Sequence, residues 1–374
     1  MQQPNVFHLV SNRYWGGPEE YAYGLLSRLI HDKRFYAEAV CKKNEPVLQH
    51  FRRLDVPISI LPLKGITDID SAKRLARLLR KGQSIIHVHT TTDAILAIAA
   101  RRMSRNKDNI KIVLTLHGLV RPHSNYFYKR TYRAINHLVF VSERARTEWI
   151  AGAPWANPEK ASVIRDSVTD NPHALPAPIL RQQLGIPDSQ VILMYHGRVS
   201  REKGIETLLR AVTQLNKEQF HLVIIGEGTN KFTAEIKSFI IENQLVRNVT
   251  LLGFKENIAQ LTAQADIGVL PSIEPEALGL SNLEYMRAGK AHITTNNGAQ
   301  TEYATDGRNA LLVDPANHFS LAAAIQRLID DPQLRNRIGE QAKNDFQSDL
   351  NYDIFYTKMT DLYLHLLQQK TEQQ

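Results

Sequence analysis

The sequence predicts an α/β protein with two parallel sheets, each covered by helices on both faces, joined by a linker. Three observations predict this fold. The 374 residues suit two domains of ordinary size. Short apolar runs alternate with amphipathic helical stretches along nearly the whole chain, and this alternation stops once, in a proline-containing stretch. Hydrophobic residues make up 43% of the chain and charged residues 22%, so each domain can bury a core.

The first alternation predicts the first sheet. Strands are expected at residues 6–10, 37–41, 58–61, 85–88, 112–116, 138–141 and 161–164, with helices near 19–31, 71–80, 92–103, 126–135 and 143–151. Strands that alternate with helices favour a parallel sheet, because each parallel return needs a crossover connection.

The pattern breaks at residues 166–190, which predict a linker that ends in a short helix at 179–184; the prolines there are Pro172, Pro176, Pro178 and Pro187. A second sheet is expected from strands at 191–195, 222–225, 249–252, 267–270, 291–295 and 311–313. We therefore predict a first domain over residues 1–170 and a second over 171–349. A C-terminal helix at about 350–370, with apolar residues at helical spacing, is expected to pack back on the first domain. Such sheets bind ligands at the carboxyl ends of their strands, so the two domains should face a central cleft.

Composition narrows the setting. The single cysteine, Cys41, cannot form an internal disulfide, which indicates a reducing, cytoplasmic compartment. No apolar run approaches the ~20 residues that span a bilayer, and residues 1–10 lack the cationic start of a signal peptide. Residues 1–170 hold 27 Lys and Arg against 15 Asp and Glu, so the net charge of +8 comes from the first half. A basic first half indicates contact with an anionic surface: nucleic acid, anionic lipid or a phosphorylated glycan.

The first chemical motif is the loop from His196 to Gly204, which follows a strand and precedes a helix at residues 205–215. Gly197 allows a turn with close ligand access to the backbone. Arg198 and Lys203 place two cations beside a helix N-terminus, which suits a ligand with two phosphate groups. The alternative is a solvated basic loop.

The second motif runs from Glu276 to Glu284, with Gly279 between the two carboxylates. Glu276 follows a strand and lies beside apolar residues, so it needs a polar partner, and we favour a ligand role for it. For Glu284 alone we favour a structural role, because a helix that starts at Ser281 would use Glu284 in a capping box.

These motifs, taken together, resemble the retaining glycosyltransferases of family 4 (glycosyltransferases group 1), which have the GT-B fold. The resemblance covers about residues 191–315. Its pieces, in order, are Gly197-Arg198, Lys203-Gly204, Gly226-Glu227-Gly228, Pro271-Ser272, Glu276 to Glu284, Ala288-Gly289, Glu302 and Asp306-Gly307. The first half matches more loosely, through Gly16-Gly17-Pro18-Glu19, His89 and Thr115-Leu116-His117-Gly118.

The resemblance implies a role for each matching residue. Arg198 and Lys203 hold the donor diphosphate, and Glu284 binds the ribose. Glu276 contacts the donor-sugar hydroxyls, helped by the backbone N–H groups of Ala277, Leu278, Gly279 and Leu280. His117 lies near the donor sugar and the reaction centre. Gly16 and Gly17 form a loop near the diphosphate and the acceptor.

The implied reaction transfers a sugar from a nucleotide diphosphate, with UDP expected ahead of GDP, to a glycan or lipid-linked acceptor. The implied pathway is cell-surface polysaccharide or lipopolysaccharide synthesis, with peripheral association at the inner face of the membrane. No metal or cofactor is expected, since Arg198, Lys203 and a helix N-terminus can neutralise the leaving group. A departing phosphate oxygen can accept the acceptor's proton, so retention needs no protein nucleophile. Two departures from the family pattern, Arg165-Asp166-Ser167 at the domain junction and Leu278 at a commonly aromatic position, affect junction geometry and donor-sugar seating.

Three signals are interpreted as structural. Asp68-Ile69-Asp70 matches a metal-binding motif of another glycosyltransferase fold, but it precedes a basic helix and is interpreted as its cap. Gly226-Glu227-Gly228 lacks the third glycine of a dinucleotide loop. The rings of His87 and His89 are expected on opposite faces of their strand, unable to chelate one metal together, with His87 structural and His89 a minor site candidate.

Other readings use the same residues differently. A nucleic-acid-binding protein would use the basic half, but it would leave the Glu276 to Glu284 motif unexplained and no nucleic-acid module is present, so no nucleic-acid partner is expected. A sugar-nucleotide epimerase or a phosphorylase would keep the fold. The basic helices carry Lys73, Arg74, Arg77, Arg80 and Lys81, then Arg101, Arg102, Arg105 and Lys107. They are either a solvated face over a core or a contact for anionic lipid or acceptor phosphates.

Overall fold

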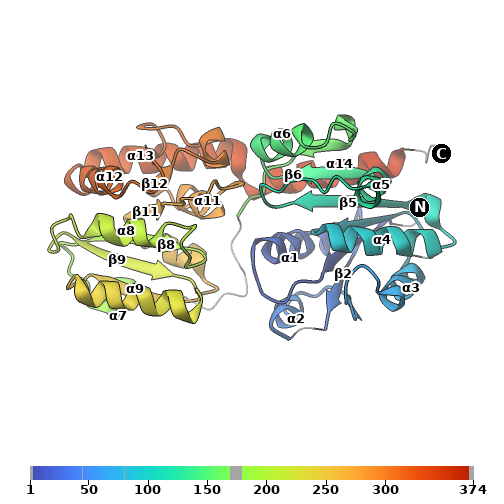
Figure 1. The fold of residues 1–374 in the computed structure, drawn as a ribbon, viewed down its shortest axis with the longest axis horizontal. Helices are drawn as coiled ribbons and strands as arrows, with labels where there is room; N and C mark the ends of the chain where they lie inside the picture. The colour runs from blue at the N-terminus through green and yellow to red at the C-terminus, as the bar shows by residue number, and fades with distance from the viewer. Residues whose placement is uncertain (1–2, 44, 80, 169–178, 370–374) are drawn as a thin grey trace. The chain divides into compact units, whose positions relative to one another are not determined.

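The computed structural model describes residues 3–43, 45–79, 81–168 and 179–369, so residues 169–178 of the predicted linker lie outside the described residues. The chain forms two compact units (Figure 1). The N-terminal unit comprises residues 1–165 together with 355–374, and the C-terminal unit comprises residues 166–354. At the start of the C-terminal unit, the Ser167 hydroxyl donates to the Leu350 carbonyl over 2.5 Å. The unusual Ser167 of the junction is thus held by the end of its own unit.

The N-terminal unit is built on a seven-stranded parallel sheet with the order β3-β2-β1-β4-β5-β6-β7. Its strands are β1 (Asn5–Val10), β2 (Tyr36–Lys42), β3 (Ile58–Leu61), β4 (Ser84–Val88), β5 (Ile110–Leu116), β6 (His137–Phe140) and β7 (Ala161–Val163). Its α-helices are α1 (Gly17–Leu29), α2 (Glu45–Phe51), α3 (Ile69–Leu78), α4 (Thr91–Met103), α5 (Tyr126–Ala134), α6 (Glu143–Ala151) and most of α14 (Tyr352–Gln368). Short 3-10 turns lie at η1 (Lys107–Asn109) and η2 (Pro158–Lys160). All seven predicted strands are present, whereas α2 was not predicted.

The C-terminal unit repeats this plan with six parallel strands in the order β10-β9-β8-β11-β12-β13. Its strands are β8 (Val191–His196), β9 (Phe220–Ile225), β10 (Val249–Gly253), β11 (Ile267–Leu270), β12 (Ala291–Thr295) and β13 (Leu311–Val313). Its helices are α7 (Leu180–Leu184), α8 (Ile205–Val212), α9 (Asn230–Glu242), α10 (Ile258–Thr262), α11 (Leu280–Arg287), α12 (His318–Asp330) and α13 (Pro332–Asp345). A 3-10 turn, η3 (Ala299–Glu302), and a π-helical turn, η4 (Phe346–Leu350), complete it. Two parallel-sheet Rossmann-like units confirm the predicted fold class.

Strands β4, β5, β9 and β12 consist entirely of buried residues. This burial follows from helices on both faces, which leave no strand face in water. In each sheet the strand order reverses beside the first strand, between β1 and β4 and between β8 and β11. The loops after those strands meet at such a switch point, which is where open α/β sheets bind ligands.

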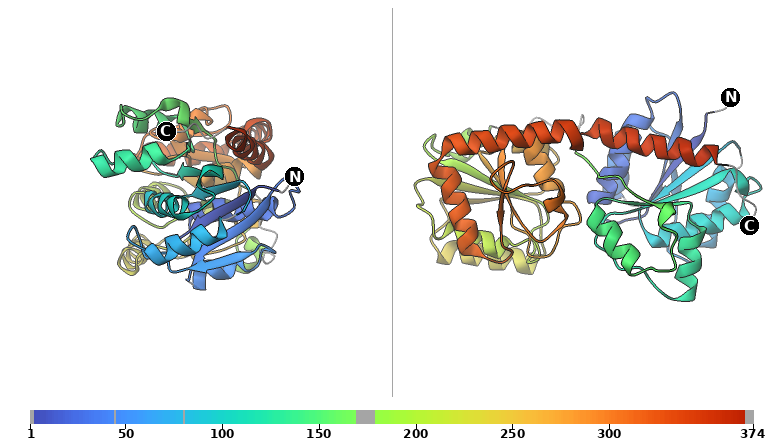
Figure 2. Two further views of the ribbon diagram at one scale, coloured as in Figure 1. Left: turned by 90° about the vertical axis from the view of Figure 1, so that its right-hand side faces the viewer. Right: turned by 90° about the horizontal axis from the view of Figure 1, so that it is seen from above.

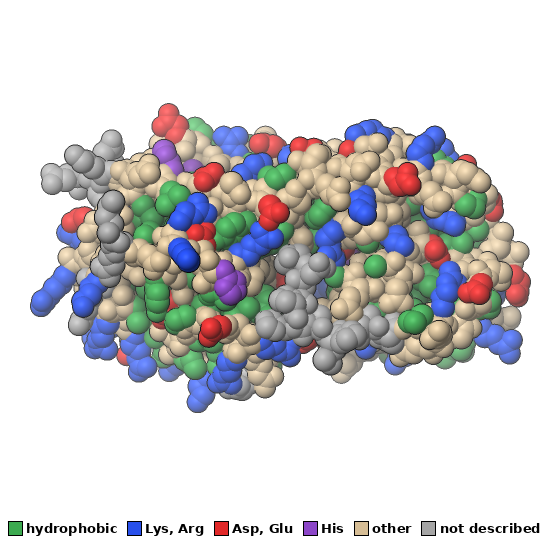
Figure 3. Space-filling model, turned by 180° about the vertical axis from the view of Figure 1, so that it is seen from behind, with side chains coloured by type: hydrophobic (Ala, Val, Ile, Leu, Met, Phe, Trp, Pro, Cys, Tyr) green, Lys and Arg blue, Asp and Glu red, His purple; other side chains and the backbone are tan. Residues whose placement is uncertain are grey.

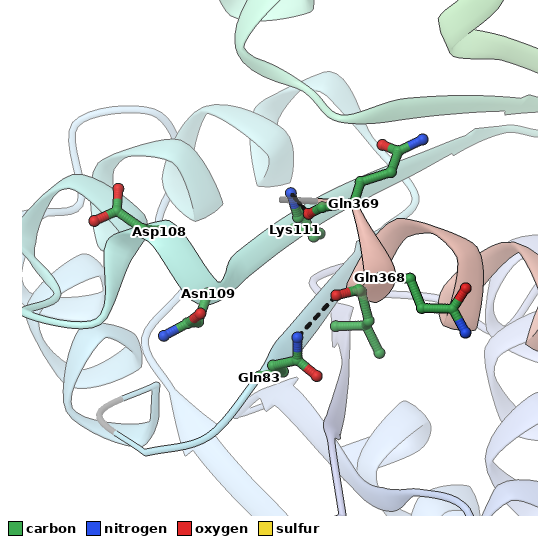
Figure 4. A pocket seen from close by; sticks show the side chains of 7 residues that line it. Gln83, Asp108, Asn109, Lys111, Gln368 and Gln369 are labelled. Carbon is green, nitrogen blue, oxygen red and sulfur yellow. Dashed lines mark hydrogen bonds between the residues drawn. The ribbon is translucent and has the colours of Figure 1, made fainter. Parts of the chain in front are cut away.

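The last helix, α14, is labelled in Figure 1, lies along the N-terminal unit and has the deepest red of the helices in Figure 2. The Tyr356 hydroxyl donates to Asp32 over 2.8 Å, and Gln83 Nε2 donates to the Leu367 carbonyl over 2.8 Å. Lys111 Nζ donates to the Gln369 carbonyl over 3.1 Å. Gln83 and Lys111 line a small polar pocket at the amino ends of β4 and β5 (Figure 4). That pocket lies at the opposite ends of these strands from the switch point.

Within the described residues, no helix combines the length and the apolar character that crossing a membrane requires.

Candidate active site

The centre of the candidate site in the C-terminal unit is an ion pair between Lys203 and Glu276. Lys203 precedes α8 and Glu276 follows β11, so the pair joins loops from neighbouring strands. Lys203 Nζ lies 2.6 Å from Glu276 Oε1, and the Ser272 hydroxyl donates to the same oxygen. The Glu276 side chain is only 11% exposed, so the polar partner that the sequence required for it is present. An ammonium has three N–H donors, and this contact leaves donors of Lys203 for an anion.

Two arginines in the β8–α8 loop differ in what they contact. Arg201 forms ion pairs with Glu206 and Glu235 and lies over the ring of Phe232. Arg198 is exposed and makes no ion pair with any described residue. Of the two guanidinium groups, Arg198 is therefore the one whose charge is not already paired within the described residues.

Glycines bring the site loops into backbone contact. Gly204 has φ +73°, and a Cβ there would lie 1.9 Å from the Pro271 carbonyl oxygen, where β11 ends. Gly226 has φ +134°, and its Cβ would lie 1.8 Å from the Gly197 carbonyl oxygen. The N–H of Val199 donates to the Glu227 carbonyl over 2.8 Å. The Gly226-Glu227-Gly228 segment thus packs against the backbone of the loop that carries Arg198, and its glycines allow this close approach.

Backbone N–H groups gather at the start of α11. Gly279, with φ +85°, is the residue before the helix, and the Tyr303 hydroxyl donates to the Leu278 carbonyl over 2.6 Å. Among the described residues, no hydrogen bond uses the N–H groups of residues 277–280. The segment that leads into α11, together with its first residue, therefore presents unpaired N–H donors next to Glu276, and such donors attract oxygen atoms of a ligand.

The capping box expected at Ser281 is wrong. The helix begins at Leu280, and Gly279 caps it without a side-chain hydrogen bond. The Ser281 hydroxyl instead donates to the His196 carbonyl over 2.8 Å, which ties α11 to the end of β8. Glu284 pairs with Arg287 over 2.7 Å, with its side chain 12% exposed. The capping role favoured for Glu284 is therefore wrong, and its side chain instead pairs within its own helix.

Sequence reasoning missed one support of Glu276. A Cβ on Gly298 would lie 2.5 Å from the Glu276 backbone nitrogen, and the N–H of Ala299 donates to the Glu276 carbonyl over 2.8 Å. The turn after β12 therefore holds the Glu276 backbone in place. The Asn-Asn-Gly sequence at residues 296–298 was an available signal, since it marks a turn at a strand's carboxyl end.

In the N-terminal unit, Gly16 and Gly17 lie where β1 leads into α1. Gly16 precedes the helix with an extended φ of −162°, and Gly17 is its first residue. A Cβ on Gly16 would make only ordinary contact, 3.4 Å from Glu19 Oε2, so no described part of this chain requires the glycine. Glu19 is buried, accepts from Asn12 Nδ2 over 2.5 Å, and has its pKa raised by burial. The glycine pair therefore lies beside a buried carboxyl group.

His117 follows β5 at the same end of the sheet. Its Nε2 lies 3.0 Å from Nδ1 of His89, which follows β4. Burial lowers the pKa of His117 to about 3, so the imidazole is neutral at physiological pH. The structure thus brings His89 and His117 together near the carboxyl ends of β4 and β5.

The expectation that His87 and His89 point to opposite faces is wrong. Residues two apart on a strand share a face, and their ring centroids are 4.7 Å apart. His8, paired with His87 in the β1–β4 register, stacks on the same face with its centroid 4.7 Å from that of His87. Even so, among the described residues no group of three or more His, Cys, Asp or Glu side chains is placed to hold a metal ion.

The Asp68-Ile69-Asp70 motif is confirmed as a helix cap. Asp68 precedes α3 and accepts from the N–H of Ser71 over 3.0 Å. Asp70 pairs with Arg74, four residues later, over 3.0 Å.

Taken together, the C-terminal unit presents an exposed guanidinium, a partly exposed ammonium and free N–H groups around one carboxylate. The cations and dipoles suit a diphosphate, and the carboxylate suits hydroxyl groups next to it.

Comparisons with known families cover nearly the whole chain. A model described as glycosyl transferases group 1 matches residues 177–345, and one described as glycosyltransferase family 4 matches residues 15–170. The chain is 31% identical over 167 residues to alpha-D-kanosaminyltransferase of Streptomyces kanamyceticus, covering 44% of this chain and 42% of that protein. It is 30% identical to lipopolysaccharide 1,2-N-acetylglucosaminetransferase of Salmonella typhimurium, covering 44% of this chain and 46% of that protein. The chain therefore spans less than half the length of these relatives.

A longer match, at 24% identity and 80% of both chains, is to N-acetyl-alpha-D-glucosaminyl L-malate synthase of Bacillus anthracis. Among solved structures, HepE of Anabaena in complex with UDP and glucose superposes with a TM-score of 0.83 at 20% identity, covering 97% of this chain and all of that one. A glycosyltransferase from Rickettsia africae gives a TM-score of 0.82 at 19% identity, over 98% of this chain and all of that one. These likenesses establish the GT-B fold, and the two matching family models show that the chain belongs to the group 1, family 4 type glycosyltransferases.

Proposed function

We propose that this protein transfers a sugar from a nucleotide diphosphate donor, UDP-linked, to a glycan or lipid-linked acceptor, with retention of configuration and without a metal. The observation that carries the proposal is the Lys203–Glu276 pair beside exposed Arg198 and the free N–H groups of residues 277–280. The HepE structures that hold UDP and glucose, or UDP-glucose, share this fold and support the choice of donor class.

In this proposal the cations stabilise the leaving group. Arg198 and the remaining donors of Lys203 bind the diphosphate, whose negative charge grows as the sugar bond breaks, so their attraction is strongest in the transition state. A phosphate oxygen of the leaving group takes the acceptor's proton on the face where the new bond forms. Charge neutralisation by side chains replaces a metal in this scheme.

The carboxylates orient the donor. Glu276, fixed by Lys203 and Ser272, accepts hydrogen bonds from donor-sugar hydroxyls, and the N–H groups of residues 277–280 donate to the sugar's oxygens. Glu284, held against Arg287, accepts from the ribose hydroxyls. In the N-terminal unit, His117 contacts the donor sugar, and the Gly16-Gly17 turn lets a ligand approach the backbone.

Titration calorimetry without metal and with EDTA tests the donor proposal. UDP, GDP and ADP, with their sugar conjugates, are titrated into wild type, Arg198→Ala, Glu284→Ala and Arg201→Ala. We expect UDP to bind, and each of the first two changes to weaken binding about 10- to 100-fold, the usual value of a charged hydrogen bond. Arg201→Ala is the matched control in the same loop and should bind normally. Absence of binding by any nucleotide, or equal losses in Arg198→Ala and Arg201→Ala, would refute the donor site.

For the acceptor, we propose a lipid-linked or lipopolysaccharide glycan at an anionic membrane surface. The relative from Salmonella typhimurium is named for lipopolysaccharide, as is a core biosynthesis glycosyltransferase of Rhizobium meliloti that is 30% identical over 194 residues. In Figure 3, Lys and Arg side chains project from the lower left edge, which belongs to the N-terminal unit.

The structure shows fewer exposed basic side chains on α3 and α4 than the sequence indicated. Arg101 donates to Asn136 and to the Ala134 carbonyl, which ties α4 to the start of β6. Arg80 lies outside the described residues. Leu75 and Leu79 are buried in the core, so the apolar face that they form on α3 cannot insert into a membrane. The remaining exposed residues that line a groove between the helices are Lys73, Arg77, Met103 and Arg105.

Co-sedimentation with vesicles tests this surface. Wild type should bind vesicles that contain anionic phospholipid and lose binding at high salt, because a surface attraction is screened. A Lys73→Glu, Arg77→Glu, Arg105→Glu variant should bind less. Equal binding to neutral and anionic vesicles would rule out the lipid contact.

A further inference from the structure

A chain of buried hydrogen-bonding side chains runs under the candidate site of the N-terminal unit. Thr115 Oγ1 lies 2.7 Å from His87 Nε2, and His87 Nδ1 lies 2.5 Å from the Tyr363 hydroxyl. That hydroxyl lies 3.5 Å from His8 Nε2. His8 Nδ1 lies 3.3 Å from His89 Nε2, and His89 Nδ1 lies 3.0 Å from His117 Nε2.

His8, His87 and His89 each form hydrogen bonds in this chain through both ring nitrogens. His117, at its end, does so through Nε2 alone. His8 and His87 are fully buried, and the ring of Tyr21 from α1 packs edge-on against His87, His89 and His117. Burial lowers the pKa of His8 to about 3 and those of His87 and His89 well below the usual value. The histidines are therefore neutral, and a neutral imidazole has one N–H donor and one acceptor nitrogen. The direction of one hydrogen bond consequently sets the direction of the next.

The far end of the chain sets this direction. The Tyr21 hydroxyl donates to Met359 Sδ over 3.3 Å, and a thioether sulfur can only accept. The Tyr21 oxygen must then accept from Thr115, which lies 3.3 Å away. With its proton engaged there, the Thr115 oxygen accepts from His87 Nε2–H.

From that point one consistent set of directions runs along the chain. His87 Nδ1 accepts from the Tyr363 hydroxyl, whose oxygen accepts from His8 Nε2–H. His8 Nδ1 accepts from His89 Nε2–H, and His89 Nδ1 accepts from His117 Nε2–H. His117 is left with its lone pair on Nδ1.

We propose that the Met359–Tyr21–Thr115–His87–Tyr363–His8–His89 chain is a positioning device that holds His117 in its Nε2–H tautomer and presents Nδ1 as a hydrogen-bond acceptor to a sugar hydroxyl. The proposal rests on the proposed function for the identity of the ligand. His117 held in this tautomer selects sugar substituents that donate a hydrogen bond, because a group that can only accept would face the Nδ1 lone pair unpaired. The six residues from Tyr21 to His89 act through His117 and touch no reacting atom.

Nitrogen NMR on the free protein tests the tautomer directly. In protein labelled with 15N-histidine, two-bond proton–nitrogen correlations distinguish Nε2–H from Nδ1–H imidazoles, and the His117→Gln spectrum identifies the His117 signals. We expect His117 to be the Nε2–H tautomer. An Nδ1–H pattern for His117 in the wild type would overturn the proposal.

Two variants test the chain. Met359→Leu keeps the volume but removes the sulfur acceptor, so Tyr21 can donate to Thr115 and the reversed direction becomes available; the Nδ1–H tautomer of His117 should appear. Tyr363→Phe breaks the chain between His87 and His8 and should also mix the tautomers. Leu366→Met, a volume-conserving change in the same helix that takes no part in the chain, should leave the wild-type pattern. Folded spectra with an unchanged His117 tautomer in both test variants would refute the proposal.

Kinetics separate this proposal from the proposed function. Met359→Leu should lower kcat/KM for sugar transfer about 2- to 10-fold, the value of one neutral hydrogen bond, with unchanged affinity for the nucleotide alone. If no nucleotide binds but the tautomers respond as expected, the proposed function fails and the positioning chain stands. If transfer occurs but the tautomer is insensitive to Met359 and Tyr363, the chain fails and the function stands.

Discussion

At the scale of single residues, the two members of the Lys203–Glu276 pair are proposed to bind different parts of the donor. Lys203 serves the diphosphate, whereas Glu276 serves the sugar, so a change at Glu276 should affect only donors that carry a sugar. Glu276→Gln removes the negative partner of Lys203 and leaves the ammonium free for phosphate. We expect UDP to bind at least as tightly as to wild type, and the sugar conjugate to lose about 10-fold or more in kcat/KM.

Calorimetry with UDP and steady-state transfer assays check this prediction. Glu274→Gln is the control, because Glu274 is an exposed carboxylate two residues before Glu276. A parallel loss of UDP and of sugar-conjugate binding in Glu276→Gln would show that Glu276 merely holds Lys203 in place.

Gly204 allows a second residue-level prediction, about stability. Gly204→Ala puts a Cβ 1.9 Å from the Pro271 carbonyl oxygen at φ +73°, so backbone must move in addition to the left-handed strain. Gly253→Ala has a similar φ of +69° with nothing within 4 Å, so it bears the strain alone, about 1–2 kcal/mol. Urea unfolding should therefore show a clearly larger loss of stability for Gly204→Ala. Equal losses of stability in the two variants would mean that the loops after β8 and β11 can move apart at little energetic cost.

Whether the sequence predicted a side chain's role depends on how far along the chain its partner lies. The Asp68 cap was predicted because cap and helix are adjacent in the chain. The Ser281 capping box failed because Ser281 found a partner 85 residues away, at His196, and competing partners of that kind leave no local trace. The histidine faces were misassigned through a wrong use of the two-residue strand period, which the sequence itself could have corrected.

At the scale of elements, α14 docks on the N-terminal unit through a charged contact. Asp32 accepts from Arg34 over 2.7 Å and from the Tyr356 hydroxyl over 2.8 Å, and its side chain is 14% exposed. The Arg34 guanidinium, with the Arg34 N–H and the Tyr356 hydroxyl, lowers the pKa of Asp32 to about 2 from 3.8. Because the folded state favours the charged form, this contact stabilises above about pH 4 and is lost as the pH falls towards 2.

Asp32→Asn should accordingly lower the free energy of unfolding by about 1 kcal/mol at pH 7, a value reduced by the exposure of Arg34. The difference from wild type should shrink below pH 4. Urea unfolding between pH 7 and pH 3 measures it, with exposed Asp55→Asn as the control. A difference that grows on acidification would contradict the assignment.

Most elements could be predicted because alternation of apolar runs is a strong signal in fully buried parallel strands. Helix α2 was missed because its seven residues include Pro46 and too few apolar positions to show a period. Helix α8 ends at Val212, three residues before its predicted end, since helix ends fray and carry weak signals.

At the scale of the whole molecule, the chain has separate cores in its two units. We expect a nucleotide to stabilise the C-terminal unit, by about 2.7 kcal/mol when its concentration is 100 times Kd. Hydrogen exchange followed by mass spectrometry should then show slower exchange in β8 and β11. Strands β2 and β3, at the edge of the other sheet, serve as the internal control. Equal slowing in all four strands would contradict a nucleotide site confined to the C-terminal unit.

The presence of two parallel sheets was predictable, but the order of the strands was not. That order depends on the edge of the sheet to which each crossover connection adds the next strand. The candidate site followed from the plan: the motif residues after β8 and β11 lie at the switch point. The supports around them, such as Gly298 against Glu276, depend on contacts between distant loops.

The discontinuity of the N-terminal unit has a consequence for biosynthesis. Residues 1–165 leave the ribosome first, yet Met359 and Tyr363 of α14 arrive only after the whole C-terminal unit has been translated. At about 5–20 residues per second, that delay lasts on the order of 10–40 seconds. During this interval the part of the first sheet that α14 covers, around His8 and His87, lacks that cover. The nascent chain must therefore pass through a state with an open apolar surface, the kind that chaperones bind.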